Sequence, residues 1–280
     1  MVNDGTLYLC ATPIGNLEDI TLRVLKILKE CDLIAAEDTR HTRKLLTHFD
    51  IHTPLTSYHA HNELKKGEKL LEKLKQGQSI AVVSDAGMPG ISDPGAEIVQ
   101  MALEEDVPVV PVPGASAVLA ALVVSGLPCA RFVFEGFLAT NKKGRRRRLE
   151  KVVNEERTLV FYESPHRLVS TLEDMQKILG NRKVAVAREI TKKHEEVYRG
   201  SIINAIEYFK NNAIKGEFTL VVSGSLGEEK EKQWEQLPIA DHVLQLMSVG
   251  LDKKQAIKKV AQLRGIPKRE VYSAVNIGNN

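Results

Sequence analysis

Short apolar runs alternate with polar turns and amphipathic segments along the first half of the chain. Apolar runs occur at 6–12, 33–36, 80–83 and 107–112, and such uninterrupted runs are typical of strands buried on both faces of a parallel sheet. Each run is followed by a polar turn, and amphipathic segments such as 96–105 have helical spacing. The order of strand, turn and helix predicts a parallel sheet with right-handed crossovers.

Four of these turns follow the predicted strands directly, at 13–16, 37–40, 84–90 and 113–116. The last two are rich in Gly, Pro, Asp and Ser. Because ligands in open α/β sheets sit outside the carboxyl ends of the strands, we expect the turns to line one small-molecule cleft. The alternative is a set of tight connections with no site, but two glycine-rich turns in series favour the cleft.

The pattern changes in the second half, which has more strands per helix. Strands are predicted at 131–138, 158–162, 183–187 and 218–222, and helices at 116–124, 168–179 and 202–210. This ratio indicates a mixed sheet. The predicted fold class is therefore α/β with two α/β domains, 1–113 with a parallel sheet and 114–225 with a mixed sheet.

The last segment, 226–280, is predicted to be a linker followed by a small helical segment. Residues 224–238 are polar and charged, and helical patterns follow at 240–248, 253–263 and 268–275. Short helices separated by a glycine turn resemble a helix-turn-helix, and the segment is basic. A packing appendage or dimer clamp and a nucleic-acid contact both remain open.

Composition limits the class of protein. The chain has 280 residues, of which 43% are hydrophobic and 27% charged, as expected of a globular protein with two domains. No apolar run approaches the roughly 20 residues that span a bilayer, and the first residues lack the pattern of a signal peptide. The three widely spaced cysteines, Cys10, Cys31 and Cys129, favour reduced thiols in a cytoplasmic protein.

A dense cationic run stands out, although the net charge is only +3. Six of the seven residues at 142–148 are Lys or Arg. We expect a polar connection that contacts phosphates, which favours a nucleic-acid partner. The alternative is the solvated start of a helix.

The sequence lacks the common nucleotide and hydrolase motifs. There is no GxxxxGK[ST] loop, no GxGxxG, no GxSxG and no Cys/His cluster, so no metal is expected. His59 and His61 could begin a metal site, but without further ligands nearby a polar strand end or loop is favoured. The turns offer main-chain groups, small residues, carboxylates and the Ser116 hydroxyl, which suits an adenosyl ligand that carries an amino acid.

Five motifs then give a resemblance. In order along the chain they are ATPIGNLEDIT, IAAEDTRHTRKLL, SDAGMPGISDPG, VPGASA and FYESPHR. With these motifs the chain resembles the tetrapyrrole-methylase superfamily over about 6–224. More narrowly, the chain is similar to the branch of small-subunit ribosomal RNA methyltransferases I, and its C-terminal helices also resemble those of this branch. The resemblance implies S-adenosylmethionine in a cleft between the two domains and a homodimer. It further implies methyl transfer to the ribose 2′-oxygen of a cytidine at the decoding centre.

The resemblance also implies the residues that contact the cofactor. They are Pro13, Ala86, Gly87, Met88, Ser116, Ala117, Tyr162, Glu163 and Thr219. The chain departs from tetrapyrrole enzymes where it has Gly87-Met88-Pro89 instead of Gly-Asp-Pro, which argues against a tetrapyrrole substrate. Met88 can contribute main-chain contacts but no side-chain hydrogen bond there.

Catalysis on a ribose hydroxyl gains from a general base, because this hydroxyl is a poor nucleophile near neutral pH. The candidates at strand ends are Asp38, Glu163 and Glu189. Asp38 could instead pair with Arg40, and Glu189 with Arg188 or Lys192, so a mechanism without a single base stays open. The residues expected to bind RNA phosphates are Arg40, Arg43, Arg145, Arg146, Arg147 and Arg148. The alternative functions are a small-molecule, tetrapyrrole-type methylase and a non-catalytic nucleic-acid-binding protein.

Overall fold

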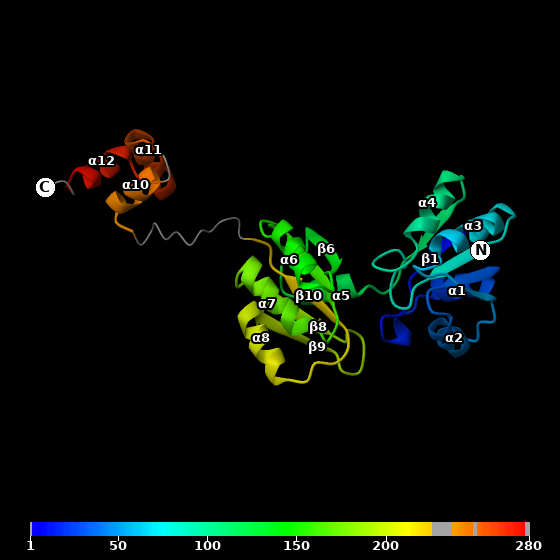
Figure 1. Ribbon diagram of the computed structural model, residues 1–280. Helices are drawn as coiled ribbons and strands as arrows, with labels where there is room; N and C mark the ends of the chain where they lie inside the picture. Colours follow the sequence, from blue (N-terminus) through cyan, green and yellow to red (C-terminus); the bar gives the residue numbers. More distant parts are fainter. Residues whose placement is uncertain (1, 226–236, 249–250, 278–280) are drawn as a thin grey trace. The chain divides into compact units, whose positions relative to one another are not determined.

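The computed structural model describes residues 2–225, 237–248 and 251–277. The chain divides into two compact units, Met1–Ser225 and Leu226–Asn280, and the larger unit contains two five-stranded sheets (Figure 1). Most of the predicted linker, residues 226–236, lies outside the described residues. The division of the larger unit at residue 113 stays a prediction.

The first sheet has the order β3-β2-β4-β1-β5, and all of its pairs are parallel, as predicted. Its strands are β1 (Leu7–Cys10), β2 (Leu33–Ala36), β3 (Leu55–Ser57), β4 (Ile80–Val83) and β5 (Val109–Val112), and its helices are η1 (Leu17–Asp19), α1 (Leu22–Glu30), α2 (Thr39–His48), α3 (Glu63–Lys75) and α4 (Ala96–Glu104). One expectation is wrong: β5 is not buried on both faces, because it forms an edge and Pro111 is exposed.

Side chains that alternate along the central strands supply the cores on the two faces of this sheet. Tyr8 and Cys10 pack with residues of α1 and α2, whereas Leu7 and Leu9 pack with residues of α3 and α4. Each fully buried aliphatic side chain contributes roughly 1.5–3 kcal/mol. The helices thus fix β1 and β4 at the centre and hold the turns that follow them at one edge.

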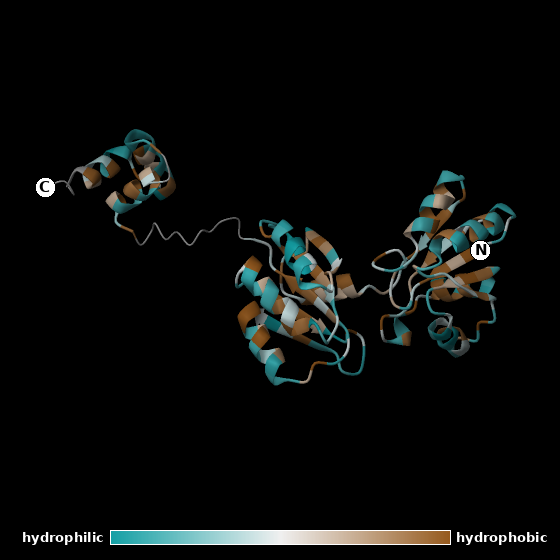
Figure 2. Ribbon diagram, viewed as in Figure 1, coloured by the Kyte–Doolittle hydropathy of each residue, from teal (hydrophilic) through white to brown (hydrophobic). Residues whose placement is uncertain are grey.

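The second sheet has the order β6-β7-β10-β8-β9. The pair β6–β7 is parallel and the other pairs are antiparallel, which confirms the mixed sheet. Its strands are β6 (Phe132–Phe137), β7 (Thr158–Glu163), β8 (Lys183–Arg188), β9 (Glu196–Ser201) and β10 (Phe218–Val222), and its helices are α5 (Ala117–Val124), α6 (Lys142–Lys151), α7 (Leu168–Leu179) and α8 (Ile202–Asn211). The apolar helix α5 packs on one face of the sheet, and α6, α7 and α8 pack on the other. Figure 2 shows hydrophobic residues in the strands of this sheet and a mixture of hydrophobic and hydrophilic residues in its helices.

Two elements of this half differ from the expectation. The strand β9 was missed because Glu196, Arg199 and Ser201 interrupt its short apolar pattern. The cationic run is the helix α6 and not an irregular connection: Asn141 caps it, with its side chain accepting a hydrogen bond from Gly144 N at 2.7 Å. Asparagine is among the best N-cap residues, and this signal was available in the sequence.

The smaller unit consists of α10 (Ile239–Ser248), α11 (Lys253–Arg264) and α12 (Lys268–Ile277). Its core contains Val243, Ile257 and Val271. α11 ends at Gly265 in the left-handed conformation, and α12 begins three residues later, which is the spacing of a helix-turn-helix. No helix among the described residues is long and apolar enough to cross a membrane.

Candidate functional site

The turns that follow β1, β2 and β4 meet at one edge of the first sheet, as the sequence predicts. Thr12 and Gly87 exchange backbone hydrogen bonds of 2.9 and 3.1 Å. Asp38 N donates to Asp85 Oδ1 at 3.1 Å, and Asp85 N donates to Glu37 Oε2 at 3.4 Å. These reciprocal bonds fix the three turns relative to one another.

A cavity of about 340 Å³ is lined by residues of both domains of the larger unit. The lining includes Ile14, Ala86, Gly87, Met88, Ile91, Ser92, Asp93, Ser116, Ala117, Phe137, Tyr162, Glu163, Ala187, Glu189, Lys192, Glu217 and Thr219. All of the expected cofactor residues line it except Pro13, which lines a neighbouring cavity. We call this cavity, which residues of both domains line, the interdomain cavity.

A close approach of the two domains occurs beside this cavity. Gly136 has φ +63°, and a Cβ there would lie 3.2 Å from Ser92 Oγ. The register of β6 against β7 shifts between Phe134 and Gly136, a β-bulge that re-aims the following side chain. The next residue, Phe137, lines the interdomain cavity.

Asp93 is a carboxylate of the interdomain cavity that the sequence analysis does not single out. Burial raises its pKa to about 7, and the nearby charges of Glu37 and Asp85 act in the same direction. Burial and the charge of Asp93 raise the pKa of Tyr162 to about 12. The sequence motif around Asp93 reads as a turn, and its raised pKa depends on burial and on the charge of Glu37, which follows a different strand, as well as on Asp85 of the same loop.

The contacts of Asp38 indicate a structural role for this residue. Its side chain caps α2 by accepting a hydrogen bond from Arg40 N at 2.8 Å, and Oδ2 pairs with Arg40 Nη2 at 2.8 Å. These contacts hold the pKa of Asp38 well below its ordinary value. Asp38 lines neither the interdomain cavity nor its neighbour, so the geometry argues against it as the base.

The other two carboxylate candidates line the interdomain cavity but are already engaged. Glu163 accepts hydrogen bonds from Ser164 N at 2.8 Å and Thr171 Oγ1 at 2.6 Å, and it pairs with Arg167. It therefore holds the turn between β7 and α7 in place.

Glu189 belongs to a charged cluster at the end of β8. Its Oε1 accepts hydrogen bonds from Lys192 Nζ at 2.9 Å and from Glu217 N at 2.9 Å. Although burial opposes ionisation, these bonds and the charge of Lys192 lower the pKa of Glu189. Glu189 is thus an ionised carboxylate with a fixed position.

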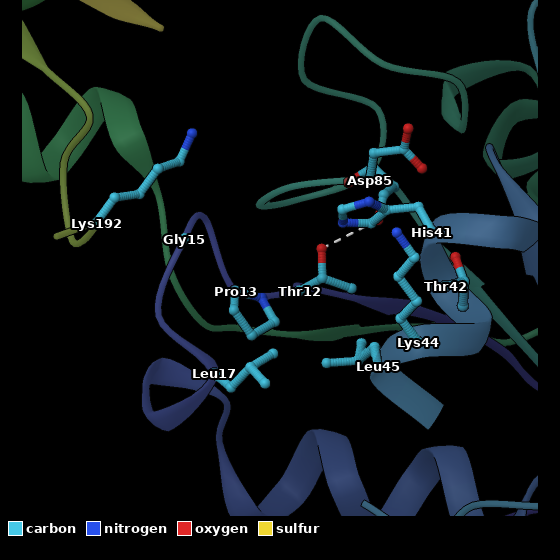
Figure 3. A pocket seen from close by; sticks show the side chains of 11 residues that line it. Thr12, Pro13, Gly15, Leu17, His41, Thr42, Lys44, Leu45, Asp85 and Lys192 are labelled. Carbon is cyan, nitrogen blue, oxygen red and sulfur yellow. Dashed lines mark hydrogen bonds between the residues drawn. The ribbon is translucent and has the colours of Figure 1, made fainter. Parts of the chain in front are cut away.

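A second cavity, of about 330 Å³, is drawn in Figure 3 and shares Lys192 with the interdomain cavity. It is lined by Thr12, Pro13, Gly15, Leu17, His41, Thr42, Lys44, Leu45, Ser84, Asp85 and Lys192. Two turns separate the cavities: Pro13 and Gly15 line the second cavity, whereas Ile14 lines the interdomain cavity. In the other turn, Ser84 and Asp85 line the second cavity and the next residues line the first. Lys192 lines both.

The arginines of the cationic run differ in their surroundings. Arg145 is buried and pairs with Asp174 at 2.7 Å, and Arg146 Nε lies 2.6 Å from the same carboxylate. Arg148 Nη2 donates to Glu135 at 2.8 Å. The expectation that Arg145 contacts RNA needs correction, because its guanidinium is enclosed. Arg147 is exposed and has no ion pair with any residue that the structure describes.

The remaining cations expected to bind RNA lie on the exposed side of α2. An open hollow of about 520 Å³ on this side is lined by Arg40, Arg43, Lys44, Thr47 and His48. Arg40 is partly neutralised by Asp38, whereas Arg43 is exposed. Lys44 lines this hollow and also the second cavity.

Comparison with known proteins agrees with this architecture. The family model of the tetrapyrrole (corrin/porphyrin) methylases matches residues 6–205, which defines the class of the fold and its interdomain cavity. A solved uroporphyrin-III C-methyltransferase from Thermus thermophilus, in complex with S-adenosyl homocysteine, has a TM-score of 0.55 at 20% identity. That match covers 77% of this chain and 96% of the other.

Closer relatives identify the group within this class. A ribosomal RNA small subunit methyltransferase I from Halalkalibacterium halodurans is 53% identical over 96% of this chain and 94% of its own. A protein of the same name from Thermotoga maritima is 50% identical over 79% of this chain and 99% of its own. The chain therefore belongs to the tetrapyrrole (corrin/porphyrin) methylase family and, within it, to the ribosomal RNA small subunit methyltransferases I.

Proposed function

We propose that the protein transfers a methyl group from S-adenosylmethionine to the ribose 2′-oxygen of a cytidine in small-subunit ribosomal RNA. The observation that carries the proposal is the 53% identity, over 96% of this chain, to a relative named ribosomal RNA small subunit methyltransferase I. The interdomain cavity and the exposed cations of α2 fit such a reaction, because it needs a small-molecule donor beside a polyanionic acceptor.

The chemistry of the interdomain cavity fits the cofactor. The main chain of Ala86–Met88 and the small residues Ser116 and Ala117 allow a close approach of the ligand, and Gly87 has φ +82°, which glycine adopts at little cost. The carboxylates of Asp93 and Glu217 also line the cavity and would attract the positive charges of the cofactor. When bound, S-adenosylmethionine supplies an electrophilic methyl group on a sulfonium.

Among the carboxylates, we propose Asp93 as the group that accepts the proton of the ribose hydroxyl. A base works best when its pKa lies near the operating pH, and that of Asp93 is about 7. Asp38 and Glu163 are tied to structural partners, and Glu189 is ionised and paired. With donor and acceptor bound, the Asp93 carboxylate would take up the proton that the ribose hydroxyl loses on methylation and so become a neutral carboxyl group.

RNA is proposed to contact two cationic surfaces. One lies on α2 around Arg43, and the other contains Arg147 of α6; both residues are exposed. The basic residues of the smaller unit, including the exposed Lys254 and Lys258 of α11, are proposed to make further phosphate contacts. Such contacts position the RNA and make its affinity dependent on salt.

We further propose a cytoplasmic homodimer. Helix α5 is apolar on all sides, and its outward residues Leu119 and Val123 are 53% and 69% exposed. An apolar helix face that none of the described residues covers suits a second copy. Val123→Asp is expected to convert the dimer to a monomer in sedimentation equilibrium. An unchanged mass would reject this face as the interface.

The function is tested with small ribosomal subunits that lack the methyl group. With radiolabelled S-adenosylmethionine, we expect the label on one cytidine, and we expect the phosphodiester bond after it to resist alkali because its 2′-oxygen is blocked. Label on a base would reject ribose methylation. Label on uroporphyrinogen but not on RNA would support the tetrapyrrole alternative, and no cofactor binding in calorimetry would support a non-catalytic nucleic-acid-binding protein.

A further inference from the structure

Three hollows of the larger unit are linked in series by single lysines. Lys44 lines both the open hollow on α2 and the second cavity. Lys192 lines both the second cavity and the interdomain cavity. The second cavity therefore lies between the cationic face of α2 and the cavity proposed for the methyl donor.

The lining of the second cavity combines two kinds of surface. Pro13, Leu17 and Leu45 provide apolar contact area, and Figure 3 shows the three together on one side of the pocket. His41 and Lys44 of α2 lie above them in this view, and Lys192, which also lines the pocket, lies at the far left on a separate segment. An apolar surface beside cations suits an occupant that has a flat ring or ribose and a phosphate, which is the chemistry of a nucleotide.

Lys192 is held at the junction of the two cavities. Its Nζ lies 2.9 Å from Glu189 Oε1 and 2.8 Å from Glu217 Oε2. The segment that carries it has positive φ angles at Glu189 (49°) and Thr191 (68°), which are uncommon for residues other than glycine and require support from the surroundings. A Cβ at Gly15 would overlap the Lys192 side chain, so the glycine leaves space for the lysine.

We propose that the second cavity binds the acceptor nucleotide of the RNA and that Lys192 is a positioning residue at its junction with the donor cavity. The RNA backbone follows α2, Lys44 contacts a phosphate at the entrance, and the apolar residues contact the ribose or base. Lys192 orients the nucleotide toward the opening between the cavities. This inference rests on the proposed function, which supplies the RNA acceptor.

The entrance and the apolar side are tested in the full-length protein with two variants and two matched controls. Lys44→Gln removes the shared cation, and Leu17→Ala shortens the apolar lining. Lys29→Gln and Leu22→Ala are the controls, since both residues are exposed and line none of the three hollows. The measurements are the KM for unmethylated small subunits, its dependence on salt, and the Kd of S-adenosylmethionine from calorimetry.

We expect the KM for small subunits to rise roughly three- to tenfold in both test variants. For Lys44→Gln the slope of log KM against log salt should also fall, by about 0.7 for one contact with a single-stranded phosphate. The cofactor Kd should change by less than about twofold. An equal loss of cofactor affinity would overturn the inference by assigning the second cavity to the donor, and so would an unchanged KM.

The role of Lys192 is tested by comparing Lys192→Gln, Lys192→Arg and the adjacent, exposed control Lys193→Gln. A positioning role predicts that Lys192→Gln lowers kcat and raises the KM for RNA while the fold, followed by circular dichroism, is unchanged. Lys192→Arg should restore part of both. If Lys192→Gln leaves both parameters unchanged, or if arginine restores folding but not the kinetics, the role is rejected.

Failure of this inference is distinguishable from failure of the proposed function. If the unaltered protein binds S-adenosylmethionine but methylates no ribosomal RNA, the proposed function fails and takes the acceptor site with it. If the unaltered protein methylates RNA and the cavity variants match their controls, the inference alone fails.

Discussion

The buried carboxylate beneath the cationic run offers a direct test of the packing. Asp174 is 3% exposed and holds both Arg145 and Arg146. Asp174→Ala removes no positive charge from the run, but it leaves the buried Arg145 guanidinium without its carboxylate. Breaking a buried ion pair from one side costs about 3–5 kcal/mol, because the remaining charge is desolvated without compensation.

The neighbouring residue provides a matched control. Glu173 pairs with Lys210 at 2.6 Å, and both side chains are about half exposed. A surface pair of this kind contributes about 0–1 kcal/mol, so Glu173→Ala should have little effect. For a unit of this size each kcal/mol shifts the melting temperature by about 2–4 °C. Asp174→Ala is thus expected to lower the melting temperature by roughly 6–20 °C.

The assay is unfolding by urea and by heat, followed by circular dichroism, with Arg147→Ala as a third variant. The exposed Arg147 should leave stability unchanged and reduce the salt dependence of RNA binding. If Asp174→Ala is no less stable than Glu173→Ala, the buried pair does not have the energetic role that its geometry indicates. If Arg147→Ala also unfolds at a lower urea concentration or temperature than the unaltered protein, the division of the run into structural and exposed cations is wrong.

Three further results are expected. In folded protein the pKa of Asp93 is about 7, above its ordinary value of 3.8, so the unfolded chain loses this proton first and stability falls as pH rises between about 4 and 7. Asp93→Asn should reduce that fall in urea unfolding at pH 5 and pH 8, and an identical pH dependence would contradict the assignment. Gly136→Ala and Gly180→Ala both place alanine at positive φ and should each cost about 1–3 kcal/mol. Only Gly136→Ala should weaken cofactor binding in calorimetry, since a Cβ at Gly180 has no atom within 4 Å. Removing residues 226–280 should leave the cofactor Kd unchanged and lower the salt slope of RNA binding; a lost cofactor affinity would show that the smaller unit supports the cavity.

The parts of the fold that follow from local patterns could be predicted from the sequence. β2 and β4 lie where the apolar runs indicate, because central parallel strands are apolar on both faces. β5 has a similar composition but lies at an edge, and strand order depends on contacts between distant segments. β9 was missed because an edge strand needs few apolar residues.

The roles of the polar residues could be predicted only in part. The motif positions Ala86, Gly87 and Ser116 line the interdomain cavity, and their contact with the cofactor stays a prediction. By contrast, Arg145 looked like its neighbours in the sequence, and its partner Asp174 is 29 residues away. The raised pKa of Asp93 likewise depends first on burial and then on the charges of Glu37, which follows β2, and Asp85, which follows β4 in the same loop. Desolvation and long-range charge are properties of the assembled structure.

The partition between the two cavities separates two kinds of sequence change. Pro13 and Gly15 line one cavity and Ile14 lines the other, so substitutions at neighbouring positions of this turn alter different cavities. If the second cavity holds the acceptor, as proposed, divergence at Pro13 or Leu17 would change the choice of acceptor without altering the lining of the interdomain cavity. A lineage could in this way acquire a new acceptor through a few point changes in one short turn.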